Sequence, residues 1–136
     1  RFSYGMIART KEFVVNLTTK TLARACDYCG VKSGRDVDKF KETGLSAAPA
    51  AYVRAPLIVQ SPVNMECRVK EILHLGSHDM FLSEVLGVHV DKKYLENNGK
   101  FDLSRAEPVV YSHGEYYRLG ELLGSFGYSV KKKGKR

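Results

Sequence analysis

The segment VNMECRV, residues 63–69, alternates apolar and polar side chains along its whole length. This alternation is typical of a β-strand with one buried face and one exposed face. A second segment with apolar residues at alternate positions, residues 79–90, follows a Gly-Ser turn at residues 76–77. Two long strands joined by a tight turn form an antiparallel hairpin. The pattern shifts phase near residues 71–72, which indicates a β-bulge.

Shorter elements are predicted on both sides of this hairpin. Residues 12–17 and 109–111 are rich in β-branched and aromatic side chains and predict short strands. Residues 46–56 contain two prolines and predict a loop. Four helical segments are expected, at residues 3–11, 20–28, 37–43 and 115–123. A few helices among mostly antiparallel strands are typical of an α+β domain built on a barrel or sandwich.

Three of these helices have recognisable ends. Each follows a Ser, Thr or Asp whose side chain can accept a hydrogen bond from the first turn. The expected caps are Ser3, Thr18 with Thr19, and Asp36. We expect the second helix to stop at Gly30 and the third at Gly44, because glycine adopts the left-handed conformation that closes many helices.

The length and charge of the chain limit its class. Its 136 residues suit one domain, and it carries 22 Lys and Arg against 15 Asp and Glu, a net charge of +7. Five of the basic residues lie in residues 131–136. We therefore expect a domain over residues 1–130 and a basic disordered tail over residues 131–136. The tail has no aromatic residues, which argues against a nucleic-acid partner, although a basic nucleic-acid-associated protein stays an alternative. No apolar run approaches the roughly 20 residues of a membrane span, so no membrane partner is expected.

The three cysteines indicate a compartment and offer one motif. Cys26, Cys29 and Cys67 cannot all pair with one another, which favours a reducing compartment and a cytoplasmic protein. The CxxC formed by Cys26 and Cys29 is a weak candidate for a metal or redox site, since no second ligand pair follows at a suitable spacing. The alternative is two small, partly buried residues one helical turn apart.

Two helix starts and one turn are candidates for ligand binding. Residues 1–4 (RFSY) and 33–36 (SGRD) each place a hydroxyl and a guanidinium beside free backbone N–H groups, which suits a phosphate. The alternative for both is a plain helix cap. His78 lies in the turn of the long hairpin, where Asp79 could orient its ring and a ligand could reach it.

Seven segments, taken in order, resemble one protein family. They are RFSY (1–4), EFVVNL (12–17), DYCG (27–30), SGRDVDKF (33–40), SPVN (61–64), GSHD (76–79) and GSFGYS (124–129). Together they resemble the flavin reductase-like family, the FMN-binding split barrels that include flavoredoxins and ferric reductases. The resemblance implies a mainly β Greek-key split barrel with a few short helices, which forms a homodimer with FMN near the interface. Relatives carry further N-terminal strands before the segment at residues 1–4, so this sequence corresponds to their C-terminal majority.

The resemblance also implies an activity and a set of site residues. NADH or NADPH would reduce bound FMN, and electrons would pass on to flavin, a ferric chelate or a partner protein. His78 would position the nicotinamide nucleotide, and no catalytic residue is assigned. The implied FMN-binding residues are Arg1, Ser3, Tyr4, Asn16, Leu17, Thr18, Ser33, Gly34, Arg35, Lys39 and Phe40. The main alternative is an FMN-binding electron-transfer module without its own NAD(P)H activity.

Overall fold

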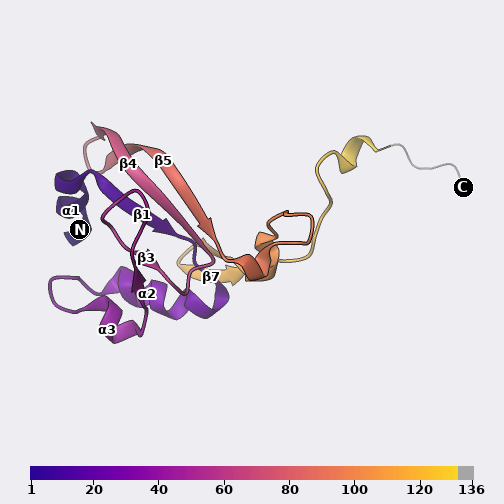
Figure 1. Cartoon of the computed structure of the whole chain (residues 1–136), viewed down its shortest axis with the longest axis horizontal. Coiled ribbons are helices and arrows are strands. Elements are labelled where there is room, and N and C mark those ends of the chain that lie inside the picture. Colours follow the sequence, from indigo (N-terminus) through magenta and orange to yellow (C-terminus); the bar gives the residue numbers. More distant parts are fainter. Residues whose placement is uncertain (132–136) are drawn as a thin grey trace, which may run out of the picture.

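A three-stranded antiparallel sheet forms the centre of the protein (Figure 1). The computed structural model describes residues 1–131. The sheet contains β1 (Glu12–Asn16), β4 (Val63–His74) and β5 (Asp79–Val90), with β4 in the middle. The predicted long hairpin is therefore confirmed. Its register shifts at two places, between residues 66 and 67 and between residues 69 and 71, and the second shift is the predicted bulge.

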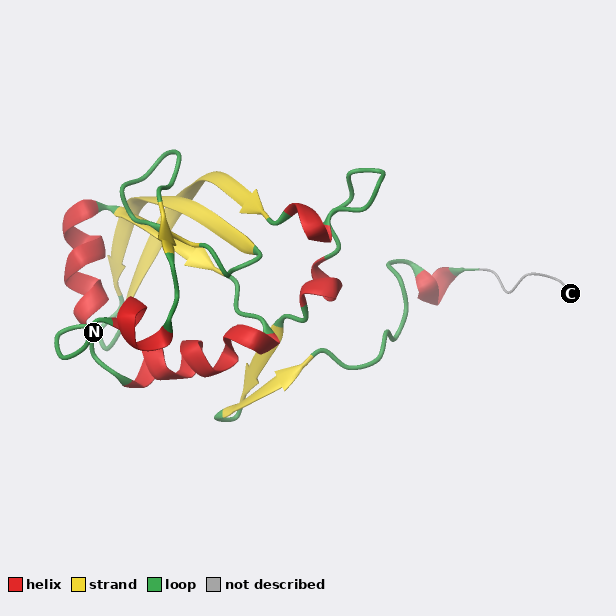
Figure 2. Ribbon diagram, turned by 60° about the horizontal axis from the view of Figure 1, so that its bottom comes forward, coloured by secondary structure: helices red, strands yellow, loops and turns green. Residues whose placement is uncertain are grey.

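The helices lie at the ends and sides of this sheet (Figures 1 and 2). They are α1 (Phe2–Thr10), a 3-10 turn (Lys20–Leu22) that leads into α2 (Ala23–Val31), and α3 (Lys39–Thr43). Further 3-10 turns cover Lys92–Tyr94, Leu103–Ala106 and Tyr128–Val130. None of the helices within residues 1–131 is long and apolar enough to cross a membrane.

The three predicted helix starts are wrong, and local hydrogen bonds explain why. Ser3 lies inside α1, which begins one residue earlier and has no side-chain cap. The Thr19 hydroxyl contacts the Thr21 hydroxyl instead of capping the next helix. Asp36 donates its N–H to the carbonyl of Ser33 in a turn, so α3 begins later and is capped by Asp38, whose carboxylate accepts from the Lys41 N–H.

The ends of α2 and α3 differ in how glycine is used. The helix α2 continues through Gly30 to Val31, because its hydrogen bonds carry on to Lys32 N–H, which donates to the carbonyl of Tyr28. Gly44 ends α3 as predicted, at a φ of 68°. Glycine adopts a positive φ of this size at little cost, because it has no Cβ.

Two small sheets complete the fold. The short strands β2 (Ala47–Ala48) and β3 (Leu57–Ile58) pair within and beside the predicted loop. The hairpin of β6 (Val109–Ser112) and β7 (Glu115–Arg118) replaces the helix predicted at residues 115–123. His113 and Gly114 both have positive φ, which makes the tight turn that folds the tyrosine-rich β7 back onto β6. Residues 132–136 of the predicted tail lie outside the described residues.

The two faces of the central sheet have unexpected environments. Residues that pair across neighbouring strands lie on the same face of a sheet. One face of the central sheet carries the rows Asn16–Asn64–His89 and Val14–Glu66–Gly87. The other face carries the rows Val15–Met65–Val88 and Phe13–Cys67–Val85. The expectation that the polar face is exposed is wrong at Asn64, which is 6% exposed, and at Glu66, which is fully buried. The segment around residues 51–58 covers these two side chains and supplies hydrogen-bond donors to them.

Gly87 leaves room for Tyr52 to lie on the sheet. A Cβ at this position would come within 2.6 Å of the Tyr52 ring. Gly87→Ala should displace Tyr52, whose N–H binds Glu66, and lower the thermal unfolding midpoint by about 5 °C. Calorimetry of the single variants and of Tyr52→Ala/Gly87→Ala tests this, because the double variant should lose less than the sum of the two losses. Simple additivity would show that the ring does not cause the effect.

Candidate functional site

A cavity of about 780 Å³ lies where the start of α1, the end of α2 and the following loop meet. Six of the residues predicted from sequence to bind the cofactor line it together: Arg1, Ser3, Ser33, Gly34, Arg35 and Lys39. Lys32 adds a fourth basic side chain to this wall. The only acidic side chain of the lining is that of Asp38, which caps α3. We call this space the basic cavity.

Contacts between the two segments fix the shape of the basic cavity. Arg1 donates from Nη1 to the carbonyl of Gly30 at 3.1 Å, which ties the start of α1 to the end of α2. The Arg35 guanidinium lies 5.7 Å from the centre of the Phe2 ring, a cation–π distance. Gly34 packs so closely on this ring that a Cβ would come within 2.9 Å of it. These contacts hold two guanidinium groups beside the open N-terminus of α1.

Three more residues of the predicted set line a smaller cavity of about 170 Å³. Asn16, Leu17 and Thr18 lie at the end of β1 and face the same space as Cys26 and Cys29 of α2. Asn16 is held in place because its amide donates to Asn64 Oδ1 at 2.5 Å. The helix α2 is therefore a wall of both cavities.

Tyr4 and Phe40 line neither of these two cavities. The Tyr4 hydroxyl instead donates to Asp79 Oδ2 at 2.5 Å, and its ring packs edge-on against Phe81. This hydrogen bond raises the pKa of Tyr4 and, together with a second one from His74, lowers the pKa of Asp79. Tyr4 thus joins α1 to the turn of the long hairpin and does not face the basic cavity.

His78 lies exposed at the tip of the hairpin, after Gly76 with a φ of 90°. Its Nδ1 lies 3.0 Å from the Ser77 hydroxyl. Asp79 does not orient His78, because its carboxylate contacts Tyr4 and, at 2.9 Å, His74 Nδ1. Sequence reasoning missed His74, although residues 74 and 79 form the last pair of the hairpin before its turn. Within residues 1–131, the Nε2 of His78 has no hydrogen-bond partner.

The cysteines do not assemble a metal centre within residues 1–131, where no three metal-binding side chains come together. Cys67 is buried in β4, which raises the pKa of its thiol, and it lines neither cavity. Cys26 and Cys29 remain two thiols on one side of α2, at the smaller cavity. Both cysteines therefore line the smaller cavity.

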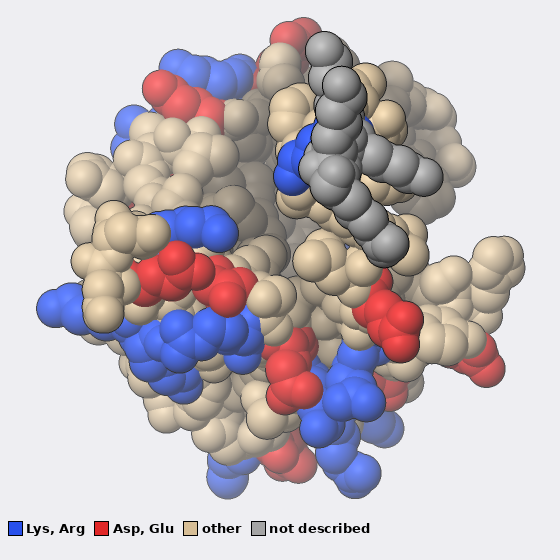
Figure 3. All heavy atoms as spheres, turned by 90° about the vertical axis from the view of Figure 1, so that its right-hand side faces the viewer, with Lys and Arg blue, Asp and Glu red and all other residues tan. Residues whose placement is uncertain are grey.

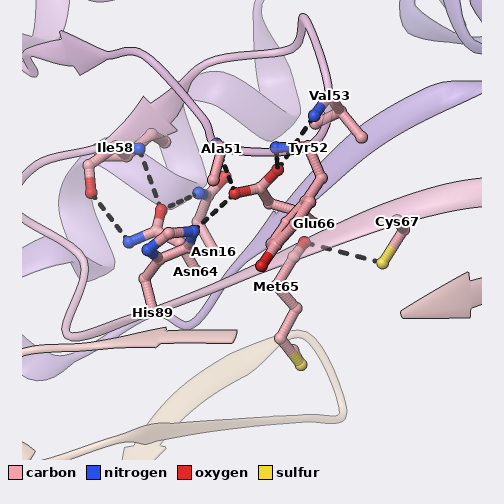
Figure 4. A network of polar contacts seen from close by, with 10 residues as sticks. All are labelled: Asn16, Ala51, Tyr52, Val53, Ile58, Asn64, Met65, Glu66, Cys67 and His89. Atoms are coloured by element: carbon pink, nitrogen blue, oxygen red, sulfur yellow. Dashed lines mark hydrogen bonds and ion pairs between the residues drawn. The ribbon is translucent and has the colours of Figure 1, made fainter. Parts of the chain in front are cut away.

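A buried polar network supports the sheet behind these cavities, and sequence reasoning missed it (Figure 4). Glu66 Oε1 accepts from the Ala51 N–H at 2.8 Å and contacts His89 Nε2 at 2.5 Å, while Oε2 accepts from the N–H groups of Tyr52 and Val53 at 2.6 and 3.0 Å. Burial alone would raise the pKa of Glu66, but these hydrogen bonds outweigh it and lower the pKa to about 2. The carboxylate is therefore ionised at neutral pH, and its hydrogen bonds anchor the covering segment.

The fold, the basic cavity and the comparisons agree on the class of protein. Residues 1–120 match the family described as flavin reductase like domain, and the chain belongs to this family. Solved structures confirm the mostly β fold with a few helices and the split-barrel architecture. One of them is described as a flavin reductase with split barrel domain from Shewanella frigidimarina. It is 21% identical, with a TM-score of 0.79, and the match covers 93% of this chain and 65% of that chain.

More similar proteins are flavoredoxins and uncharacterized archaeal and bacterial proteins. The flavoredoxin of Desulfovibrio vulgaris (Miyazaki F) is 29% identical with a TM-score of 0.86 over 96% of this chain and 70% of that chain. An uncharacterized protein of Archaeoglobus fulgidus is 30% identical over 104 residues, which are 76% of this chain and 58% of that protein. This chain spans little more than half the length of such curated relatives.

Proposed function

We propose that this chain binds FMN and that hydride from NADH or NADPH is transferred to the bound flavin. The observation that carries the proposal is the basic cavity, with four basic side chains, two serines and the uncapped start of a nine-residue helix around one space. This donor set fits a phosphate, because guanidinium groups, hydroxyls and backbone N–H groups at a helix start all donate to its oxygens. Membership of the flavin reductase like family is the reason for proposing that this phosphate belongs to a flavin.

The two cavities fit the two ends of such a cofactor. Arg1 and Arg35 would hold the phosphate, with Ser3, Ser33 and Lys39 as further donors. Asn16, Leu17 and Thr18 would contact the ring system at the smaller, less polar cavity. Bound flavin would supply the two-electron chemistry itself. The work of the protein is to hold the ring, exclude water around it and align the nucleotide.

His78 is proposed to align the nicotinamide nucleotide. His78→Asn should raise the KM for NADH or NADPH about tenfold, because one hydrogen bond to the nucleotide is lost, and should leave the Kd for FMN unchanged. Steady-state kinetics and an FMN titration measure the two constants. His113→Asn is the matched control, since His113 is also an exposed turn histidine and its φ of 50° suits asparagine. Weaker FMN binding with an unchanged KM would contradict this role.

The function itself is tested by colour and by reduction. The purified protein should be yellow and should release FMN on denaturation. Mixing it with NADH and with NADPH in a stopped-flow instrument should bleach the flavin rapidly with at least one of them. A yellow protein that neither nucleotide bleaches would instead be an electron-transfer module that receives its electrons from another protein. Adding free flavin, a ferric chelate or a candidate protein after reduction identifies the acceptor.

Two further proposals concern the setting of this activity. The family resemblance leads us to propose a homodimer, which sedimentation measures directly. The thiols of Cys26, Cys29 and Cys67 are all free, which suits a reducing compartment, and we place the activity in the cytoplasm. A nucleic-acid role has less support, because basic and acidic side chains are intermixed on the face seen in Figure 3 and Lys20 and Arg118 both pair with Glu107.

A further inference from the structure

The CxxC of α2 is a motif that the proposed flavin chemistry does not use. Cys26 and Cys29 lie three positions apart in this helix, and both line the smaller cavity. Cys26 is exposed, Cys29 is partly buried, and both thiols are free. The motif therefore has one thiol that a molecule from solution can reach and a second, less accessible thiol beside the same space.

The geometry of α2 brings these two cysteines close enough to form a disulfide. Cα atoms three positions apart in an α-helix are separated by about 5 Å. Disulfides join residues whose Cα atoms are about 4.4–6.8 Å apart. Cys67 does not share this space, because it is buried in β4 and lines neither cavity. Its burial also raises the pKa of its thiol, which disfavours the reactive thiolate.

Contacts from two other elements hold this part of α2 in place. The Tyr116 hydroxyl of β7 donates to Asp27 Oδ1 at 3.2 Å, and Lys39 Nζ donates to the carbonyl of Cys29 at 2.5 Å. The residues at the end of β1 that we propose to contact the flavin ring line the same cavity as the two thiols. The cysteine pair therefore lies beside the place where a reduced flavin would give up its electrons.

We propose that Cys26 and Cys29 form a redox pair that passes electrons from the reduced flavin to a disulfide of low molecular weight. This proposal rests on the proposed function and names the chemical class of the electron acceptor. The shared cavity supports it, because the ring and both thiols face one small space and no separate carrier is required between them. A small disulfide enters such a concave site more easily than a disulfide held within a folded protein.

The exchange balances in atoms and electrons. The Cys26 thiolate attacks one sulfur of the substrate, which breaks its S–S bond, forms a mixed disulfide and releases one thiol. The Cys29 thiolate then attacks Cys26 Sγ, which forms the Cys26–Cys29 disulfide and releases the second thiol. Both released thiols carry the protons that the cysteines lost. Two electrons and two protons from the reduced flavin restore the cysteine thiols, so one NADH or NADPH and one proton convert one disulfide into two thiols.

Thiol mapping tests the exchange steps without relying on enzyme turnover. The purified protein is exposed to oxidised glutathione, its remaining thiols are alkylated after denaturation, and its peptides are analysed by mass spectrometry. We expect a Cys26–Cys29 disulfide in the wild type and glutathione retained on Cys26 in Cys29→Ser. Cys67 is the internal control and should stay a thiol. No modification of Cys26, or earlier modification of Cys67, would overturn the proposal.

Electron transfer to the pair is tested with the oxidised, FMN-loaded protein. Anaerobic mixing with NADH or NADPH should return Cys26 and Cys29 to thiols, which alkylation counts, whereas the same protein without FMN should keep its disulfide. A disulfide that persists while the flavin is bleached would overturn this proposal and leave the proposed function intact. If neither nucleotide bleaches the flavin, the proposed hydride transfer is wrong, and photoreduction of the flavin applies the same test to the pair. A protein that binds no FMN contradicts both proposals.

Turnover with a named acceptor completes the test. With oxidised glutathione, the ratio of nucleotide oxidation to flavin bleaching should fall at least about 100-fold in Cys26→Ser, because a serine hydroxyl does not replace a thiolate in disulfide exchange. Cys67→Ser is the matched control and should keep this ratio, since the carbonyl of Met65 near Cys67 Sγ can accept from the new hydroxyl. An unchanged ratio in Cys26→Ser would overturn the proposal. Faster reduction of insulin than of glutathione disulfide would overturn the assignment to small disulfides.

Discussion

Glu66→Gln should lower the thermal unfolding midpoint by on the order of 10 °C, the largest stability effect that we expect from a near-isosteric change. Each carboxylate oxygen of Glu66 receives two hydrogen bonds inside the fold. Glutamine has one oxygen, so its NH₂ group would face two donors where only an acceptor fits. Buried donors without acceptors destabilise the folded state. Glu71→Gln is the control, because Glu71 lies exposed in the same strand.

The same carboxylate gives the protein a defined acid sensitivity. The pKa of Glu66 is about 2 in the folded state against 4.5 for an ordinary glutamate. A group with a lowered folded pKa contributes stability that is fully present above its unfolded pKa and is lost as the pH falls toward its folded pKa. The free energy of unfolding should thus decrease between about pH 4.5 and 2. Denaturation followed at several pH values should show a smaller decrease for Glu66→Gln, and an equal decrease in both proteins would contradict the assignment.

Arg35→Ala should weaken FMN binding by roughly 10- to 100-fold, the range expected for the loss of a charged hydrogen bond to a phosphate. Arg35 is the cleanest test of the basic cavity, because Arg1 and Lys39 also hold α2 through its carbonyl groups. Arg9→Ala removes the same charge from the far end of α1 and serves as the control. Titration of the FMN-free protein gives the Kd.

The outcome separates three explanations. Loss with Arg35→Ala but not with Arg9→Ala supports phosphate binding in the basic cavity. Equal loss in both variants would mean that only the overall charge attracts the cofactor, and no loss in either would place the phosphate elsewhere. The KM for the nicotinamide nucleotide should stay unchanged in Arg35→Ala, the reverse of the pattern expected for His78→Asn.

The long hairpin could be predicted from the sequence because its signal is local. Apolar residues at every second position and a glycine at the turn describe two strands without reference to the rest of the chain. The burial of Glu66 and Asn64 could not be predicted in this way, since it depends on N–H groups of the segment near residue 52. The strand β7 was missed although its two tyrosines favour a strand. Its pairing with β6 depends on the turn at residues 113–114, which the segment alone does not reveal.

The candidate site was predicted only in part. The prediction was incomplete because neighbouring residues in the sequence were given one role. Arg1 and Ser3 do face the same cavity as Ser33 and Arg35, across thirty positions of the chain. Tyr4 was included because residues 1–4 resemble one family segment, and the whole segment was given a single role. Successive residues of a helix point about 100° apart, so one side of α1 faces the cavity while Tyr4 contacts the hairpin.

The helix α2 places a constraint on how this protein can change. The carbonyl of Cys29 accepts from Lys39 Nζ at 2.5 Å and that of Gly30 accepts from Arg1, so the last turn of α2 orients two cations of the basic cavity. Side chains from earlier in the same helix form a wall of the second cavity. A substitution that tilts α2 would therefore also move Arg1 and Lys39, two of the residues that we propose to bind the phosphate. A substitution in α2 that changes the shape of one cavity must therefore also be tolerated by the other. The two cavities cannot change independently of each other.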